Sequence, residues 1–107
     1  MESNKVKVRL TCPKTHSDNL RIALGDAGFG AISNYSHCST VTEIKGYCKP
    51  NDAADPFIGE AGKLEEIDEV IIEFRGTKDQ LPKLKEILKE HHPYEEIGVD
   101  VFPLLEF

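Results

Sequence analysis

The sequence is poor in several features that would assign a class of protein directly. It has no tryptophan, one methionine and three cysteines, and its 13 lysine and arginine residues are outnumbered by 19 acidic ones. This deficit of positive charge argues against nucleic-acid and anionic-membrane partners, because both require a basic surface. No apolar run approaches the about eighteen residues needed to cross a bilayer, and residues 1–7 lack the apolar stretch of a secretory leader. We therefore expect a cytoplasmic protein with no nucleic-acid and no membrane partner.

The cysteines and the length indicate the redox state and the number of domains. Cys12, Cys38 and Cys48 are odd in number and include no closely spaced pair, which favours free thiols over a disulfide framework or a zinc ribbon. A chain of 107 residues is long enough to bury one core, so we expect a single domain over residues 1–107. Neither the phosphate-binding loop nor the dinucleotide-binding glycine pattern is present.

The hydrophobic periodicity predicts six regular elements. Period-two patterns predict strands at 5–12, 70–75 and 97–102, and β-branched and hydroxyl residues predict another at 35–42. Apolar residues at helical spacing predict helices at 20–27, ended by Gly28, and from about Thr77 to His92. Thr77 and Gln80 have the spacing of a capping box, and Pro103 should close the last strand.

Turn-forming residues dominate the segment from Glu43 to Glu66. Its glycines, prolines, Asn51 and Asp52 predict a loop or irregular hairpin of about twenty residues. The resulting order, strand, helix, strand, strand, helix, strand, is typical of an α+β ferredoxin-like sandwich with both helices on one face of the sheet. Ile71 and Phe102 would then lie on the uncovered face, which favours a partner subunit over that face.

Two segments concentrate side chains that could bind a metal or do chemistry. His92 ends the predicted second helix and Glu95 follows it, and their imidazole and carboxylate suit zinc, manganese or iron. His92 as a structural residue at the helix end is the alternative. In the other segment, His37 and Cys38 are neighbours on a predicted strand and point to opposite faces, which disfavours a nucleophile–base pair and favours a structural cysteine. A metal site formed by His37, Cys38, His92 and Glu95 is the hypothesis that joins both segments.

Four ordered motifs carry a resemblance to a known family. They are GAISNYSHCS at 30–39, PFIGEAGKLE at 56–65, HPYEE at 92–96 and DVFPL at 100–104. Together they resemble the insert domain of YqfO-type proteins, which also occurs as a free-standing small protein. The resemblance implies a fold similar to CutA and the PII signalling proteins, which form trimers through their sheets. In YqfO-type proteins the domain is inserted between two halves that bear a dinuclear metal centre and are labelled as relatives of a GTP cyclohydrolase. No metal-ligand motif of those halves matches this sequence, so the resemblance does not transfer their activity.

The function that these observations favour is a non-enzymatic homotrimeric module that binds a metal ion, a small ligand or a partner protein. Its loops would contact the ligand or partner through Asn34, Tyr35, Ser36, Gly59, Glu60, Lys63, Tyr94 and Glu96. One alternative is a metal-dependent hydrolase that uses His37, Cys38, His92 and Glu95. Another is a structural subunit that docks on a separately encoded YqfO-type metalloprotein.

Overall fold

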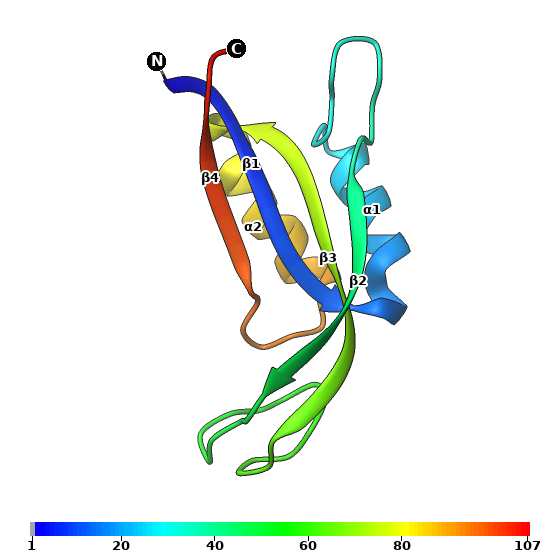
Figure 1. The fold of residues 1–107 in the computed structure, drawn as a ribbon, viewed down its shortest axis with the longest axis vertical. Coiled ribbons are helices and arrows are strands. Elements are labelled where there is room, and N and C mark those ends of the chain that lie inside the picture. The colour runs from blue at the N-terminus through cyan, green and yellow to red at the C-terminus, as the bar shows by residue number, and fades with distance from the viewer. Residues whose placement is uncertain (1) are drawn as a thin grey trace.

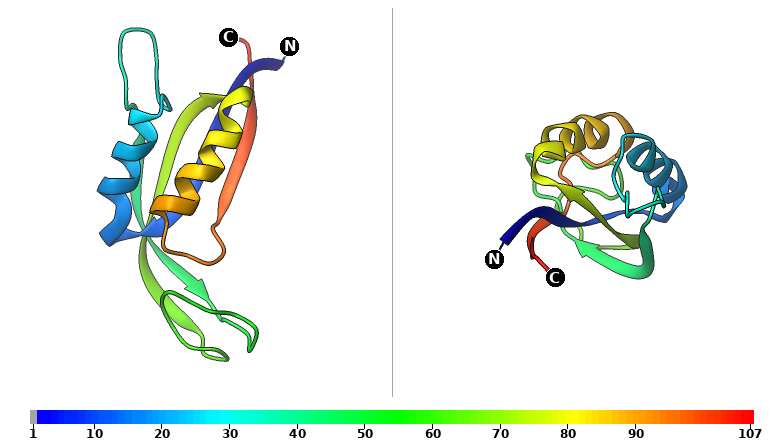
Figure 2. Two further views of the ribbon diagram at one scale, coloured as in Figure 1. Left: turned by 180° about the vertical axis from the view of Figure 1, so that it is seen from behind. Right: turned by 90° about the horizontal axis from the view of Figure 1, so that it is seen from above.

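Four antiparallel strands form one sheet in the order β2-β3-β1-β4, and two helices cover one of its faces (Figures 1 and 2). The computed structural model describes residues 2–107. The strands are β1 (Glu2–Pro13), β2 (Thr40–Cys48), β3 (Glu65–Thr77) and β4 (Val99–Leu105). The helices are α1 (Ser17–Asp26) and α2 (Leu81–His91), each preceded by a 3₁₀ turn, η1 (Lys14–His16) and η2 (Lys78–Gln80). The predicted ferredoxin-like α+β sandwich is confirmed.

Alternation along β1 and β3 builds the core between the sheet and the helices. Leu10 lies opposite Ile72, and Cys12 lies opposite Val70, with all four side chains buried. Burial of a large apolar side chain contributes about 1.5–3 kcal/mol to the stability of the folded state. The helices complete the core with Leu20, Leu24, Leu84, Ile87 and Leu88.

The ends of the helices follow the signals in the sequence. Gly28 has φ +100° just after α1, a conformation that favours glycine at a helix end. Thr77 and Gln80 form the predicted capping box at η2, and Pro82 lies in the first turn of α2, where its missing N–H is not needed.

Two predicted boundaries around β2 are wrong. Residues 35–39 are not strand, because the backbone turns there and His37 has φ +59°. The predicted loop from Glu43 to Glu66 is shorter, since β2 continues to Cys48 and β3 begins at Glu65, leaving 49–64 as the connection. The missed strand ends lie beyond β1: residues 45–48 and 65–68 pair only with each other and form an arm that extends from the sheet (Figure 1). Such two-stranded pairing carries too little apolar patterning to be recognised in the sequence.

The predicted end of the last strand at Pro103 is also wrong, because β4 passes through Pro103 to Leu105. β4 is an edge strand, and an edge position can accommodate a residue without a backbone N–H. Among residues 2–107, no helix combines the length and the apolar character needed to span a membrane.

The sheet face turned away from the helices, here called the open face, carries the two apolar residues expected there. Ile71 lies opposite Thr11, and Phe102 lies opposite Lys7, so both side chains are on this face. Phe102 is 46% exposed. Ion pairs surround them, with Lys7 Nζ 3.0 Å from Glu73 and Arg9 3.8 Å from Asp100.

Candidate ligand-binding cavity at the arm end

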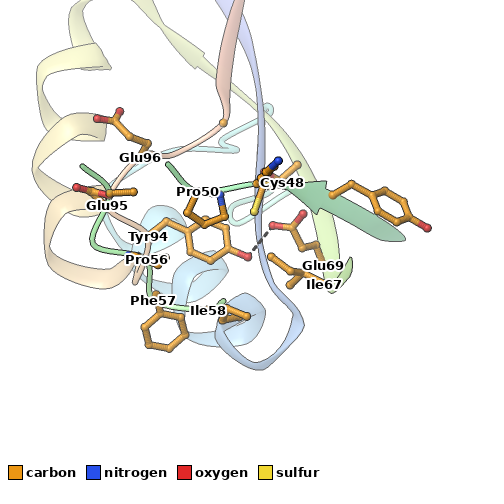
Figure 3. Close-up of a pocket in the computed structure, with 15 residues that line it drawn as sticks. Cys48, Pro50, Pro56, Phe57, Ile58, Ile67, Glu69, Tyr94, Glu95 and Glu96 are labelled. Carbon is orange, nitrogen blue, oxygen red and sulfur yellow. Dashed lines mark hydrogen bonds between the residues drawn. The ribbon is translucent and has the colours of Figure 1, made fainter. Parts of the chain in front are cut away.

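A cavity of about 350 Å³ lies where the arm, the 49–64 connection and the turn between α2 and β4 meet (Figure 3). We call it the arm-end cavity. The arm and the connection are continuous in the sequence, whereas the turn is distant from both and meets them because the arm extends past the ends of β1 and α2. Its wall consists of Thr11, Tyr47, Cys48, Lys49, Pro50, Ala54, Pro56, Phe57, Ile58, Ile67, Glu69, Tyr94, Glu95, Glu96 and Gly98.

Tyr94 and Glu69 form the polar centre of the cavity. The Tyr94 hydroxyl donates a hydrogen bond of 2.7 Å to Glu69 Oε2, as Figure 3 shows. Glu69 is only 9% exposed. Its carboxylate packs over Gly46, where a Cβ would lie 1.6 Å from Oε1. Burial, together with the bond to Glu69 and its negative charge, raises the pKa of Tyr94 well above its ordinary value.

His92 is buried behind this centre and has partners on both ring nitrogens. Nε2 lies 2.7 Å from the carbonyl oxygen of Thr11, and Nδ1 accepts a 3.2 Å bond from the Tyr94 N–H. A carbonyl oxygen can only accept, so the proton of the neutral ring is on Nε2. Burial lowers the pKa of His92 and outweighs the bond to the Thr11 carbonyl, which acts in the opposite direction. The structure therefore supports the structural role of His92.

The 49–64 connection is tied to the turn that carries Tyr94. The Asp55 N–H donates a 2.9 Å hydrogen bond to Glu95 Oε2. The Phe57 ring lies between two others, with centroid distances of 5.5 Å to His16 and 6.5 Å to Tyr94. These contacts hold the connection against the turn after α2 and against η1.

Cys12 is close enough to the cavity for the charge of Glu69 to affect it, but its thiol is fully buried in the core. Burial first, and the charge of Glu69 second, raise the pKa of Cys12 to about 11. The thiol is therefore protonated at neutral pH, which is the opposite of an activated nucleophile.

His37 and Cys38 lie at the other end of the molecule. Residues 30–38 form a narrow projection, here called the finger, that follows α1 at the same end of the long axis as the chain termini (Figures 1 and 2). Its tip is closed by paired backbone bonds of 2.9 Å between Ile32 and Tyr35. The His37 ring packs against Gly25, with Nε2 2.9 Å from Asp26 Oδ1 and Nδ1 2.8 Å from Ser36 Oγ. Cys38 is half-buried at the finger base.

The structure separates the predicted site residues into three places. His92, Tyr94, Glu95 and Glu96 meet at the arm-end cavity, and Asn34, Tyr35, Ser36, His37 and Cys38 belong to the finger. Gly59, Glu60 and Lys63 lie in the 49–64 connection without lining the cavity. Within residues 2–107, no three histidine, cysteine or acidic side chains are grouped closely enough to hold a metal ion. One chain therefore does not bring His37 and Cys38 to His92 and Glu95.

Of the two residues at the polar centre of this cavity, Glu69 is the one that the sequence did not indicate. It is one of the five acidic residues from Glu65 to Glu73, and only its place directly before the apolar run 70–72 distinguishes it. Its partner, Tyr94, was predicted as a ligand contact.

The fold of this chain is that of CutA. Pyrococcus horikoshii CutA superimposes with a TM-score of 0.71 at 20% identity, covering 95% of this chain and 86% of CutA. Archaeoglobus fulgidus CutA, a periplasmic divalent cation tolerance protein, gives 0.70 at 14% identity over 96% of this chain and 86% of that one. At these identities the likeness shows the fold alone.

Sequence relatives then identify the domain. GTP cyclohydrolase 1 type 2 homologs are 42% identical in Halalkalibacterium halodurans and 41% identical in Bacillus subtilis, each over 98 residues and 92% of this chain. A Bacillus cereus protein related to NIF3 superimposes with a TM-score of 0.81 at 38% identity, covering 99% of this chain and 27% of that protein. No protein-family model matches the chain. The chain is a homologue of a small domain in the GTP cyclohydrolase 1 type 2 homologs, and it spans about a quarter of their length, 26%. The resemblance seen in its motifs is confirmed.

Proposed function

We propose that this chain is a non-enzymatic binding and regulatory domain that forms homotrimers and holds a small ligand in the arm-end cavity. The observation that carries the binding role is the state of the reactive groups around the cavity. The pKa of Tyr94 and that of Cys12 are both raised, mainly by burial, and His92 is held as a neutral ring with both nitrogens bonded. Catalytic acids, bases and nucleophiles need pKa values near the working pH. These groups instead have the features of a recognition site.

The charge of the cavity supports a cationic ligand. Glu69, Glu95 and Glu96 line it, and Lys49 is the one lysine or arginine among its lining residues. The structural neighbour from A. fulgidus is named for tolerance of divalent cations. A metal site that joined His37 and Cys38 to His92 and Glu95 would need two subunits, with the finger of one at the arm end of another, and His92 would have to give up one of its two ring bonds.

The open face supports self-association. Ile71 and Phe102 place apolar surface among paired charges, and burial against a second copy would remove that surface from water at about 25 cal/mol per Å². The ion pairs Lys7–Glu73 and Arg9–Asp100 neutralise the surrounding charge, so it does not repel an identical face.

Sedimentation equilibrium of the full chain at micromolar concentration tests the assembly. We expect a trimer, and we expect Phe102→Asp to shift it toward monomer by burying an unpaired charge. Ile22→Asp is the control, because Ile22 is a similarly exposed apolar residue, at 52%, on α1 rather than on the open face. A monomeric wild type, or a trimer unchanged by Phe102→Asp, contradicts the assembly.

A further inference from the structure

We propose that the arm-end cavity selects a small organic cation, in which a primary ammonium group on a short apolar or aromatic body pairs with the Glu69 carboxylate. This inference rests on the proposed binding function and names the class of ligand. Its basis is a carboxylate that is nine-tenths buried, faces a cavity of about 350 Å³ and forms no ion pair with a lysine, arginine or histidine of residues 2–107.

The Glu69 carboxylate is hydrogen-bonded by Tyr94 but forms no ion pair within the described residues 2–107. Burying a carboxylate is costly unless it is paired and hydrogen-bonded. Tyr94 supplies one hydrogen bond, but among residues 2–107 no lysine, arginine or histidine forms an ion pair with Glu69. Lys49 lines the same cavity without pairing with it. A cationic ligand would provide the missing charge.

The walls of the cavity define the rest of the ligand. Phe57, Ile58 and Ile67 supply apolar surface, and the Tyr94 ring lies beside the carboxylate (Figure 3). An ammonium ion near an aromatic face gains a cation–π attraction, while an attached apolar body gains from burial. The hydroxyl oxygen of Tyr94 donates to Glu69 and retains the capacity to accept a bond from the ammonium group.

The same geometry disfavours a bare metal ion. Zinc needs about four protein or water ligands, and calcium about six to eight, with several carboxylate or imidazole groups converging. Around Glu69, within the described residues 2–107, no such group of three exists. An ammonium group needs only one carboxylate and one or two acceptors, which Glu69 and Tyr94 provide.

Glu95 and Glu96 give the cavity additional negative charge. Glu95 is held in place by the Asp55 N–H, so its position is fixed by the connection that closes the cavity. Carboxylates beside a partly apolar cleft raise the local concentration of cations and their rate of entry.

Isothermal titration of the full-length chain with benzylamine and with benzyl alcohol tests the inference. At neutral pH the two probes share a ring and differ in the charge of one group. We expect benzylamine to bind at least about tenfold more tightly, the ratio that one charge-assisted bond supplies. Amide resonances of Cys48, Phe57 and Tyr94 in the NMR spectrum should shift with benzylamine.

Glu69→Gln and Glu66→Gln form the matched pair of variants. Both replace a glutamate of β3, but Glu66 is exposed and does not line the cavity. We expect Glu69→Gln to remove the preference for benzylamine and Glu66→Gln to keep it. The two-probe comparison on the wild type needs no variant, so it stands even if Glu69→Gln does not fold.

The outcomes separate this inference from the proposed function. The proposal of an organic cation is overturned if the two probes bind equally, or if both variants lose the preference for benzylamine to the same extent. Binding of Mn²⁺ or Zn²⁺ at these resonances without binding of benzylamine also overturns it, but leaves a binding domain intact. If the chain is monomeric and prefers benzylamine, the proposed ligand class of the cavity is supported and the proposed homotrimer is contradicted.

Discussion

The finger end and the arm end contain the same residue types in different settings. His37 in the finger and His92 at the arm end each have partners on both ring nitrogens. His37 is exposed and pairs with the exposed Asp26, whereas His92 is 7% exposed and bonds to partly buried backbone. The comparison teaches that burial, rather than the number of hydrogen bonds, decides what such a side chain contributes to stability.

Replacing each histidine by alanine should give the largest difference in stability between the two ends. We expect His92→Ala to lower the free energy of unfolding by about 2–3 kcal/mol, because it leaves a cavity and removes the partners of the Thr11 carbonyl and the Tyr94 N–H. His37→Ala should cost less than about 1 kcal/mol, since its ion pair is exposed. Urea unfolding measures both, and equal losses would show that the two ends do not differ.

Two glycines provide the second test. A Cβ on Gly46 would lie 1.6 Å from Glu69 Oε1, and a Cβ on Gly25 would lie 1.9 Å from the His37 ring. Gly46→Ala should cost about 1–2 kcal/mol, because the buried carboxylate must leave Tyr94. Gly25→Ala should change stability by less than about 0.5 kcal/mol, since the helix gains about as much as the exposed His37 contact loses. Unfolding of both variants in urea checks this, and a larger cost at Gly25 would reverse the comparison.

The tyrosines give a smaller expected difference. Tyr94→Phe removes the donor to Glu69 and should lower stability by about 1 kcal/mol. Tyr35 at the finger tip is 74% exposed, so Tyr35→Phe should stay within about 0.5 kcal/mol. Thermal unfolding of the two variants provides the measurement, and a neutral Tyr94→Phe would mean that the bond adds no net stability.

The smallest predicted effect is a dependence on pH. Because burial lowers the pKa of His92 in the folded state, the unfolded chain takes up a proton first as pH falls below the ordinary value of 6.5. Stability is therefore complete above that value and decreases as pH falls toward the lower pKa of the folded state. Unfolding curves between pH 7.5 and pH 5.5 should show a steeper decline for the wild type than for His92→Gln, with a slope below about 1.4 kcal/mol per pH unit for the single proton. A parallel decline in both proteins would exclude His92 as the source.

The core of the fold was predictable because its signals are local. The alternation of Val8 and Leu10, the capping box of Thr77 and the glycine after α1 each follow from neighbouring residues. The positions of Ile71 and Phe102 on one face follow from the same alternation.

The arm and the centre of the cavity were not predictable, because they depend on contacts between distant segments. In the sequence Gly46 predicts a turn, yet it lies in a strand where Glu69 leaves no room for a side chain. Glu69 becomes distinctive only when the turn after α2 brings Tyr94 to it from 25 positions away. His37 and His92 share one residue type, and nothing local places them at opposite ends.

The proline within β4 makes the two borders of the sheet unequal. The edge of β4 that faces away from β1 lacks a backbone N–H donor at Pro103, whereas β2 runs from Thr40 to Cys48 with no proline. A continuous ladder with an added strand can therefore form along β2 but is interrupted along β4. Endless stacking of copies into fibrils requires both borders to accept strands, so the proline protects this small sheet against that kind of polymerisation.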